Sequence, residues 1–207
     1  MAIIRSRHTL FFTTFFRWYT SRMLQKHFSG IVADLDDCPP EKPVLLIANH
    51  FSWWDGFIGN YLCYKYYHKK FHAMMLREQL ENRMFLNKAG AFSVEKSSRS
   101  AVESILYSAE ILSQKDKLLM MFPQGKIESL YHREFEFARG VEKILAKCDP
   151  PPVVMFNINL VDYFSKVSPT LFIRTQKYQG DLQAKAMEEA FKRFHTHCIS
   201  LQHEALV

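Results

Sequence analysis

The sequence has few cysteines, no glycine-rich nucleotide loop and no long apolar run. Its 207 residues include four widely spaced cysteines, none of them in a C-x-x-C pair. They are Cys38, Cys63, Cys148 and Cys198. This spacing argues against a disulfide framework and a zinc site, and it favours structural thiols in a reducing compartment. Neither G-x-G-x-x-G nor a P-loop pattern occurs, so no phosphate-cradling loop is indicated.

Acidic residues are absent from the first thirty positions, which therefore carry +5 of the formal net charge of +6. Wound as a helix, this segment places its large apolar side chains on one side: Ile4, Phe11, Phe12, Phe15, Phe16, Trp18, Tyr19 and Met23. The opposite side holds Thr13, Thr14, Arg17, Thr20 and Ser21. A basic helix with an aromatic face suits the interface of an anionic membrane. We expect residues 1–30 to form an amphipathic membrane-associating segment ahead of a domain at 31–207; the alternative is that the aromatic face packs on the domain core.

The same segment lacks the length of apolar sequence that a membrane span requires. Thr13-Thr14 and Arg17 interrupt its apolar residues, whereas a spanning helix needs about 20 of them. No small-residue cleavage site follows an apolar core, which argues against a secretory signal. We therefore expect a peripheral or monotopic protein on the cytoplasmic face of a membrane. Its basic residues interleave with a hydrophobic face, so we expect no nucleic-acid partner.

Short apolar runs alternate with helical patterns along the rest of the chain. Strands are expected at 30–37, 44–48, 71–76, 90–94, 117–121, 153–158 and 170–175. Helices are expected at 55–69, 77–88, 98–112, 137–147 and 181–204. This alternation predicts an α/β fold, with a single-domain mixed sheet flanked by helices and an N-terminal amphipathic helical segment.

The run at 44–48 leads into the strongest candidate for a reacting group. It is apolar at every position and follows a proline-rich turn, which is typical of a strand buried on both faces. His50 comes just after it, and Asp55 follows five positions later. Reacting groups collect beyond the carboxyl ends of such strands, and a histidine base needs an acceptor on its second ring nitrogen. Asp55 could be that acceptor, could cap the helix that it opens, or could do both.

Four sequence blocks in order resemble those of the glycerolipid (lysophospholipid) acyltransferase family. They are N-H-F-S-W-W-D after the buried strand, G-A-F-S-V-E-K, M-F-P-Q-G and F-E-F-A-R-G-V, within about residues 40–160. The resemblance implies that His50 deprotonates a lipid hydroxyl, which attacks the thioester of acyl-CoA or acyl carrier protein, while Asp55 orients His50. It implies no covalent enzyme intermediate, metal or cofactor. The partners would be membrane lipids and the acyl donor.

The resemblance also implies a set of substrate-binding residues. They are Asn49, Lys96, Arg99, Phe122, Pro123, Gln124, Gly125 and Lys126. The family's usual F-P-E-G-T-R-S reads F-P-Q-G-K-I-E-S here, so that Ile127 stands at an arginine position. In the family such arginines are associated with the acceptor phosphate, and a lysine is a point charge without their forked geometry. The three cations in this set, Lys96, Arg99 and Lys126, either supply a positive pocket or are solvated surface residues. The loop 122–125 is either a wall of the acceptor pocket or a simple turn that ends the strand.

These departures leave the acceptor open. The first expectation is a (lyso)glycerophospholipid-like acceptor. The altered phosphate positions favour an alternative, the hydroxyl of a glycosylated isoprenoid or an aminolipid. A non-catalytic lipid-binding membrane module with the same fold is a third possibility, against which the intact His50 and Asp55 argue.

Overall fold

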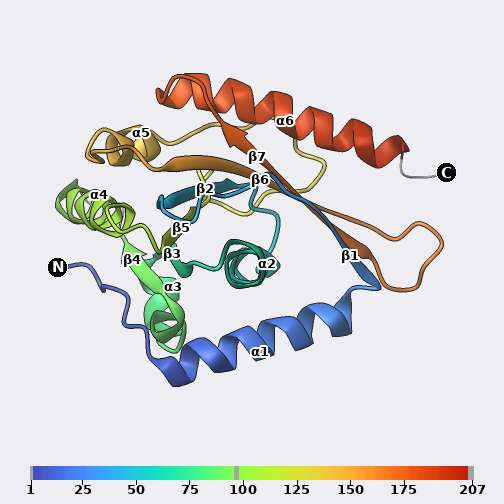
Figure 1. The fold of residues 1–207 in the computed structure, drawn as a ribbon, viewed down its shortest axis with the longest axis horizontal. Helices are drawn as coiled ribbons and strands as arrows, with labels where there is room; N and C mark the ends of the chain where they lie inside the picture. The colour runs from blue at the N-terminus through green and yellow to red at the C-terminus, as the bar shows by residue number, and fades with distance from the viewer. Residues whose placement is uncertain (1, 96–97, 205–207) are drawn as a thin grey trace.

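A seven-stranded mixed sheet forms the centre of the computed structural model, which describes residues 2–95 and 98–204 (Figure 1). The strand order is β1-β7-β6-β2-β5-β3-β4. Neighbouring strands run parallel except for β6 and β7, which are antiparallel. Helices cover both faces of the sheet, as the sequence predicted (Figure 1).

The strands follow the apolar runs of the sequence. Their bounds are β1 Gly30–Asp34, β2 Val44–Ala48, β3 Lys70–Leu76, β4 Ala91–Val94, β5 Lys117–Met121, β6 Val153–Asp162 and β7 Thr170–Tyr178. β2 and β5 are buried at every position because they lie inside the sheet with helices on both faces. β6 and β7 are longer than predicted because their antiparallel pairing continues from Val154 opposite Tyr178 to Asp162 opposite Thr170, beyond the apolar run.

The helices form one layer on each side of the sheet. Their bounds are α1 Leu10–His27, α2 Trp54–Leu62, α3 Arg77–Glu81, α4 Ser98–Leu112, α5 Gly140–Leu145 and α6 Ala184–Glu204. A π-helical turn, Cys63–Tyr67, extends α2, and a 3-10 turn, Leu86–Ala89, precedes β4. α1 and α2 pack on one face, while α4, α5 and α6 cover the other (Figure 1). None of the helices in the described part of the chain has both the length and the apolar character to cross a bilayer.

The N-terminal segment begins in an extended conformation and becomes helical only at Leu10, where the side chain of Thr9 caps the helix. The Ile4 N–H donates to Ser93 Oγ, and the Ser93 N–H donates to the Ile4 carbonyl. The prediction that Ile4 lies on the helix was therefore wrong. The residues before Leu10 cover the free edge of β4, because an edge strand offers backbone groups that need partners.

The helix α1 also faces the domain differently from the prediction. It buries Phe16, Thr20 and Leu24 against α2 and its surroundings. Thr20 was predicted on the side opposite the aromatic residues, yet it is fully buried between Phe16 and Leu24. Trp18, by contrast, is 62% exposed. One apolar stripe of α1 therefore packs on the domain while a second stripe faces solvent.

Candidate active site

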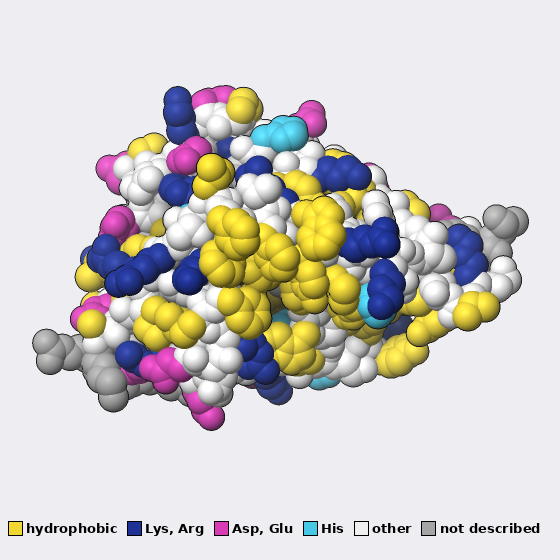
Figure 2. Space-filling model, turned by 90° about the horizontal axis from the view of Figure 1, so that it is seen from below, with side chains coloured by type: hydrophobic (Ala, Val, Ile, Leu, Met, Phe, Trp, Pro, Cys, Tyr) yellow, Lys and Arg dark blue, Asp and Glu magenta, His cyan; other side chains and the backbone are white. Residues whose placement is uncertain are grey.

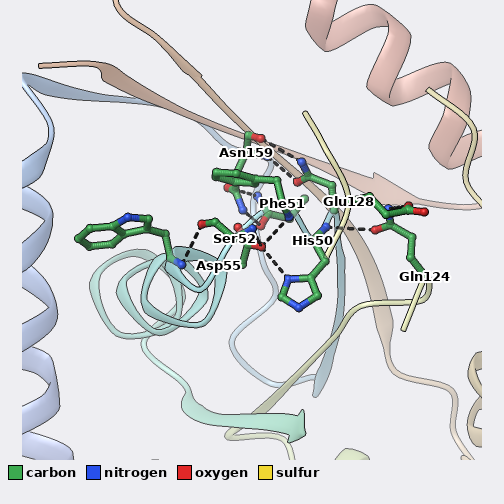
Figure 3. Close-up of polar contacts among 10 residues, drawn as sticks. His50, Phe51, Ser52, Asp55, Gln124, Glu128 and Asn159 are labelled. Carbon is green, nitrogen blue, oxygen red and sulfur yellow. Dashed lines mark hydrogen bonds and ion pairs between the residues drawn. The ribbon is translucent and has the colours of Figure 1, made fainter. Parts of the chain in front are cut away.

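His50 lies in the turn between the end of β2 and the start of α2 (Figure 3). β2 runs parallel to both of its neighbours, β5 and β6, so the carboxyl ends of all three strands meet at one edge of the sheet. The segments that follow β5 and the middle of β6 therefore surround the turn. Asn49 anchors it, because the Asn49 N–H donates to the carbonyl of Asn157 on β6.

Asp55 holds His50 through a short hydrogen bond between Nδ1 and Oδ2, 2.7 Å in length (Figure 3). The same oxygen accepts the backbone N–H groups of Phe51 at 2.8 Å and Ser52 at 2.9 Å. Asp55 therefore bonds the turn before α2 and does not act as a conventional cap of that helix. Three donors on one oxygen fix both the turn and the orientation of the imidazole ring.

The Asp55 side chain is fully buried, and its other oxygen, Oδ1, has no hydrogen-bond partner within the described residues. Burial raises the pKa of this carboxyl above its ordinary value, although the hydrogen bonds from His50 and Ser52 oppose the rise. A buried carboxylate beside an imidazole favours the tautomer that carries its proton on Nδ1. The second ring nitrogen, Nε2, is then free to accept a proton.

The ring of His50 stacks on Phe122, the first residue after β5, with centroids 4.0 Å apart and planes 13° apart. In the part of the chain that the structure describes, Nε2 of His50 makes no hydrogen bond, and the side chain is 21% exposed. The imidazole is thus held on its face by Phe122 and on its Nδ1 side by Asp55. This arrangement orients the imidazole and leaves its Nε2 without a partner among the described residues.

The loop after β5 is tied to the backbone of His50. Gln124 Oε1 accepts the His50 N–H at 3.1 Å, and the Glu128 N–H donates to the His50 carbonyl at 2.8 Å. The turn itself closes through the Gly125 N–H and the Phe122 carbonyl at 3.1 Å. Gly125 has a φ of 68°, in the left-handed region that favours glycine. The loop is therefore a structural part of the site as well as a strand-ending turn.

Glu128 is one of the residues of this site that the sequence analysis missed. It accepts a hydrogen bond from the Gln124 amide (Figure 3) and pairs with Lys126 at 3.0 Å. Burial alone would raise the pKa of Glu128, but the hydrogen bonds from Lys126 and Gln124 hold it below its ordinary value. Its spacing of four from Gln124, in the block that departs from the family pattern, was the available signal. Gln124 and Glu128 together place one acid and one amide where the pattern has a glutamate.

The other predicted binding residues lie in different settings. Asn49 is buried, and its side-chain amide bonds the backbone N–H and carbonyl of Asn159 on β6 (Figure 3). Pro123 is buried and its carbonyl accepts the Ala138 N–H. Lys96 lies outside the described residues, and so does the side chain of Arg99, whose backbone belongs to the first turn of α4. Lys126 is the predicted cation whose side chain is described, and it is 73% exposed.

The surroundings of His50 are closed on the side of α6. A cavity of about 10 Å³, room for roughly one water molecule, lies among the turn at Asn49–Phe51, the loop after β5, and His195 of α6. Burial lowers the pKa of His195 to about 4, so this second imidazole is neutral at pH 7. On the other side, Trp53 is 48% exposed, with the Arg83 guanidinium 4.5 Å from its ring centre.

Comparison with known proteins identifies a matching family model and similar folds. A family model described as Acyltransferase matches residues 31–159. No curated protein matches the chain. Among solved structures, the chain is similar to the 1-acyl-sn-glycerophosphate (LPA) acyltransferase PlsC from Thermotoga maritima, with a TM-score of 0.58 and 13% identity. The match covers 89% of this chain and 79% of that one. At this identity, the likeness supports a shared fold.

Proposed function

Because the chain belongs to the acyltransferase family, we propose that it transfers a fatty acyl chain from acyl-CoA or acyl carrier protein to a lipid hydroxyl, with His50 as general base. The observation that carries the proposal is the short bond from His50 Nδ1 to the buried Asp55, which leaves Nε2 without a partner among the described residues. A base of this kind must be oriented on one nitrogen and free on the other.

In the proposed reaction, Nε2 takes the proton of the acceptor hydroxyl as its oxygen attacks the thioester carbonyl carbon. The new C–O bond forms, the C–S bond breaks, and the departing thiolate recovers the proton from the imidazolium. Asp55 stabilises that imidazolium while it exists. General-base assistance of this type is typically worth about 10²–10⁴-fold in rate.

The first candidate acceptor is a (lyso)glycerophospholipid-like molecule. The pairing of Lys126 with Glu128 supports a second candidate, because it neutralises a cation that would otherwise meet an acceptor phosphate. Ile127, at a position where the family pattern has arginine, adds no charge. These features favour a different lipid hydroxyl, such as that of a glycosylated isoprenoid or an aminolipid.

An acceptor panel separates these candidates. Purified protein is supplied with labelled acyl-CoA or acyl carrier protein and with lysophosphatidate, other lysophospholipids, a glycosylated isoprenoid or an aminolipid, and labelled lipid products are identified by mass spectrometry. A product with lysophosphatidate alone would reject the glycosylated isoprenoid and the aminolipid as acceptors. If no acceptor is acylated with either donor although the folded protein binds the lipids, the non-catalytic module is the better account.

We also propose that the protein works at a membrane surface through the outer stripe of α1. Exposed apolar side chains gather there and on the neighbouring turn: Leu10, Phe11, Phe15, Trp18, Met84 and Phe85, together called the α1 face. Figure 2 shows this apolar area with Lys and Arg side chains around it. Arg17, Arg22 and Lys26 are exposed on the same helix, and the helix has no acid. Aromatic rings surrounded by cations suit an anionic lipid surface.

Vesicle sedimentation tests the membrane proposal. The double variant Phe15→Ser/Trp18→Ser removes two apolar side chains of the α1 face and should reduce binding to anionic vesicles by about 10-fold or more. Val167→Ser is the matched control, because Val167 is 99% exposed outside that face. Equal binding by the double variant and the wild type would reject the α1 face as the contact surface.

A further inference from the structure

A second cavity, of about 190 Å³, lies at the edge of the sheet opposite to His50. Its floor is made by the first residues of β3 and β5, whereas His50 lies two residues beyond Ala48, the last residue of β2. The extended N-terminal segment and the end of α4 form its walls. The polar side chains that line it are Ser6, His8, Lys70, His72, Tyr107, Glu110, Gln114 and Lys117. The acyl-transfer mechanism uses none of them.

Two lysines meet on the floor of this cavity. Lys70 and Lys117 are paired in register on the parallel strands β3 and β5, so their side chains leave the sheet from adjacent positions. Lys117 is only 8% exposed. Burial lowers the pKa of its ammonium group, and the neighbouring Lys70 charge lowers it further. Like charges placed side by side in a sheet are destabilising unless something compensates them.

The carboxylates nearby compensate these lysines incompletely. Asp116 approaches Lys117 only to 3.8 Å, and its side chain is 63% exposed. Glu110 lines the cavity, but it is engaged by Arg5 at 3.1 Å. A buried ammonium group normally needs a closely held partner of opposite charge. The cavity therefore keeps an excess of positive charge.

The walls add hydrogen-bonding groups. Ser6 Oγ lies 2.8 Å from the Tyr107 hydroxyl and 3.1 Å from His72 Nδ1. His72 is 4% exposed, and its other nitrogen, Nε2, has no partner within the described residues. Burial lowers the pKa of His72 to about 2 and that of His8 to about 4, so both rings are neutral at pH 7. If Ser6 donates to Nδ1, the Nε2–H of His72 is a buried donor without an acceptor.

We propose that this cavity binds a phosphate group, with Lys70 and Lys117 as its principal ligands. A tetrahedral dianion offers acceptors to two ammonium groups at once and relieves their repulsion. The volume exceeds that of a free phosphate ion, so the group can belong to a phosphate monoester as well. Because Ser6 and His8 lie in the segment that leads into α1, binding would also fasten this segment to the ends of β3 and β5.

Calorimetric titration of the full-length protein tests the proposal, with inorganic phosphate and adenosine 3′,5′-bisphosphate as probes at constant ionic strength. The wild type should bind at least one of the probes saturably. Lys70→Gln and Lys117→Gln should each weaken that binding by about 10-fold or more, since each removes a charged hydrogen-bond donor. Lys115→Gln is the control, because Lys115 is exposed and does not line the cavity.

The outcomes separate the ligand sources and the two sites. Tighter binding of the bisphosphate supports a nucleotide phosphate, and equal or tighter binding of inorganic phosphate supports the free ion. His50→Ala should bind either probe as the wild type does, whatever its acyl-transfer rate. Absence of saturable binding overturns the proposal, as does equal weakening by Lys115→Gln. If Lys117→Gln does not fold, unchanged binding by Lys70→Gln, which replaces an exposed residue, overturns it as well.

Discussion

Replacing Asp55 by asparagine should separate the catalytic role of this residue from its structural role. In the wild type, one Asp55 oxygen accepts His50 Nδ1–H and the backbone N–H groups of Phe51 and Ser52. The amide oxygen of Asn has the same position and can keep the two backbone bonds. What it cannot keep is the negative charge beside the imidazolium that forms during the reaction.

The size of the effect follows from this geometry. A unit charge about 4 Å from another is worth about 4 kcal/mol at an effective dielectric constant near 20, which corresponds to about 10³-fold in rate. We therefore expect Asp55→Asn to lower kcat by about 10³-fold. Stability should stay within about 1 kcal/mol of the wild type, because the substitution also removes the cost of burying a charge. Asp55→Ala should lose activity and also about 1–3 kcal/mol of stability, since it leaves two backbone donors without their acceptor.

The assay follows release of the free thiol from acyl-CoA in the presence of the best acceptor, alongside thermal unfolding of each variant. A rate for Asp55→Asn within about threefold of the wild type would refute the orienting and stabilising role. Equal loss of stability in Asp55→Asn and Asp55→Ala would show that the rate loss comes from a disrupted turn. The rate loss would then be no evidence that the negative charge of Asp55 stabilises the imidazolium.

Three further predictions concern the loop after β5, the buried histidine of α6 and the glycines. Gln124→Glu should lower activity, because it brings two carboxylates together at positions 124 and 128. The exchange variant Gln124→Glu/Glu128→Gln should restore activity. No recovery in the thiol-release assay would contradict a role for the Gln124–Glu128 hydrogen bond. Because burial lowers the pKa of His195 from 6.5 to about 4, its contribution to stability is complete above pH 6.5 and is lost as the pH falls toward 4. The free energy of unfolding of His195→Gln, measured with denaturant, should therefore change less with pH in this window than that of the wild type, by up to about 1 kcal/mol per pH unit. An equal pH dependence in the two proteins would contradict this. Gly90→Ala should lower the free energy of unfolding by about 2 kcal/mol, because Gly90 has a φ of 117° and a Cβ there would overlap the Phe71 carbonyl. Gly56→Ala in α2 should be neutral or stabilising, because a Cβ at Gly56 meets no atom. Equal effects of the two substitutions in thermal unfolding would contradict this difference.

The central strands and the His50–Asp55 pair were the most predictable parts of the molecule. Val44–Ala48 is apolar on both faces, and only a strand buried between two helical layers needs that pattern. The polar residues after such a strand emerge at the edge where neighbouring strands also end, so the side chain of Phe122 meets His50 there. Strand identity and direction thus determine which distant residues can come together.

The local sequence pattern could not predict where the helix α5 begins and ends or which face of α1 is buried. The helix predicted at 137–147 covers only Gly140–Leu145, because Phe137 is drawn into the core and its N–H donates to Glu188 of α6. Thr20 is buried because α1 packs on α2 with the stripe that holds Phe16, Thr20 and Leu24. In both cases a contact distant in sequence overrides the local periodicity.

The polar network around His50 was hidden for a related reason. The sequence context of Glu128 is distinguished only by its spacing of four from Gln124, and that of Asn159 is ordinary. Both residues matter because the loop after β5 and the strand β6 pass beside the turn at His50. The cavity between Lys70 and Lys117 was equally invisible, since the two residues are 47 positions apart and become neighbours through strand pairing. Spatial proximity across the sheet, and not residue type, defines these sites.

The most direct test of the proposed chemistry is single-turnover transfer of a labelled acyl chain by the folded His50→Gln variant. Glutamine keeps a polar side chain of similar size but cannot accept a proton from a hydroxyl at neutral pH. The account predicts that transfer falls by at least about 10²-fold while binding of the acyl donor and of anionic vesicles stays at the wild-type level. Transfer at the wild-type rate would contradict the assignment of His50 as the base.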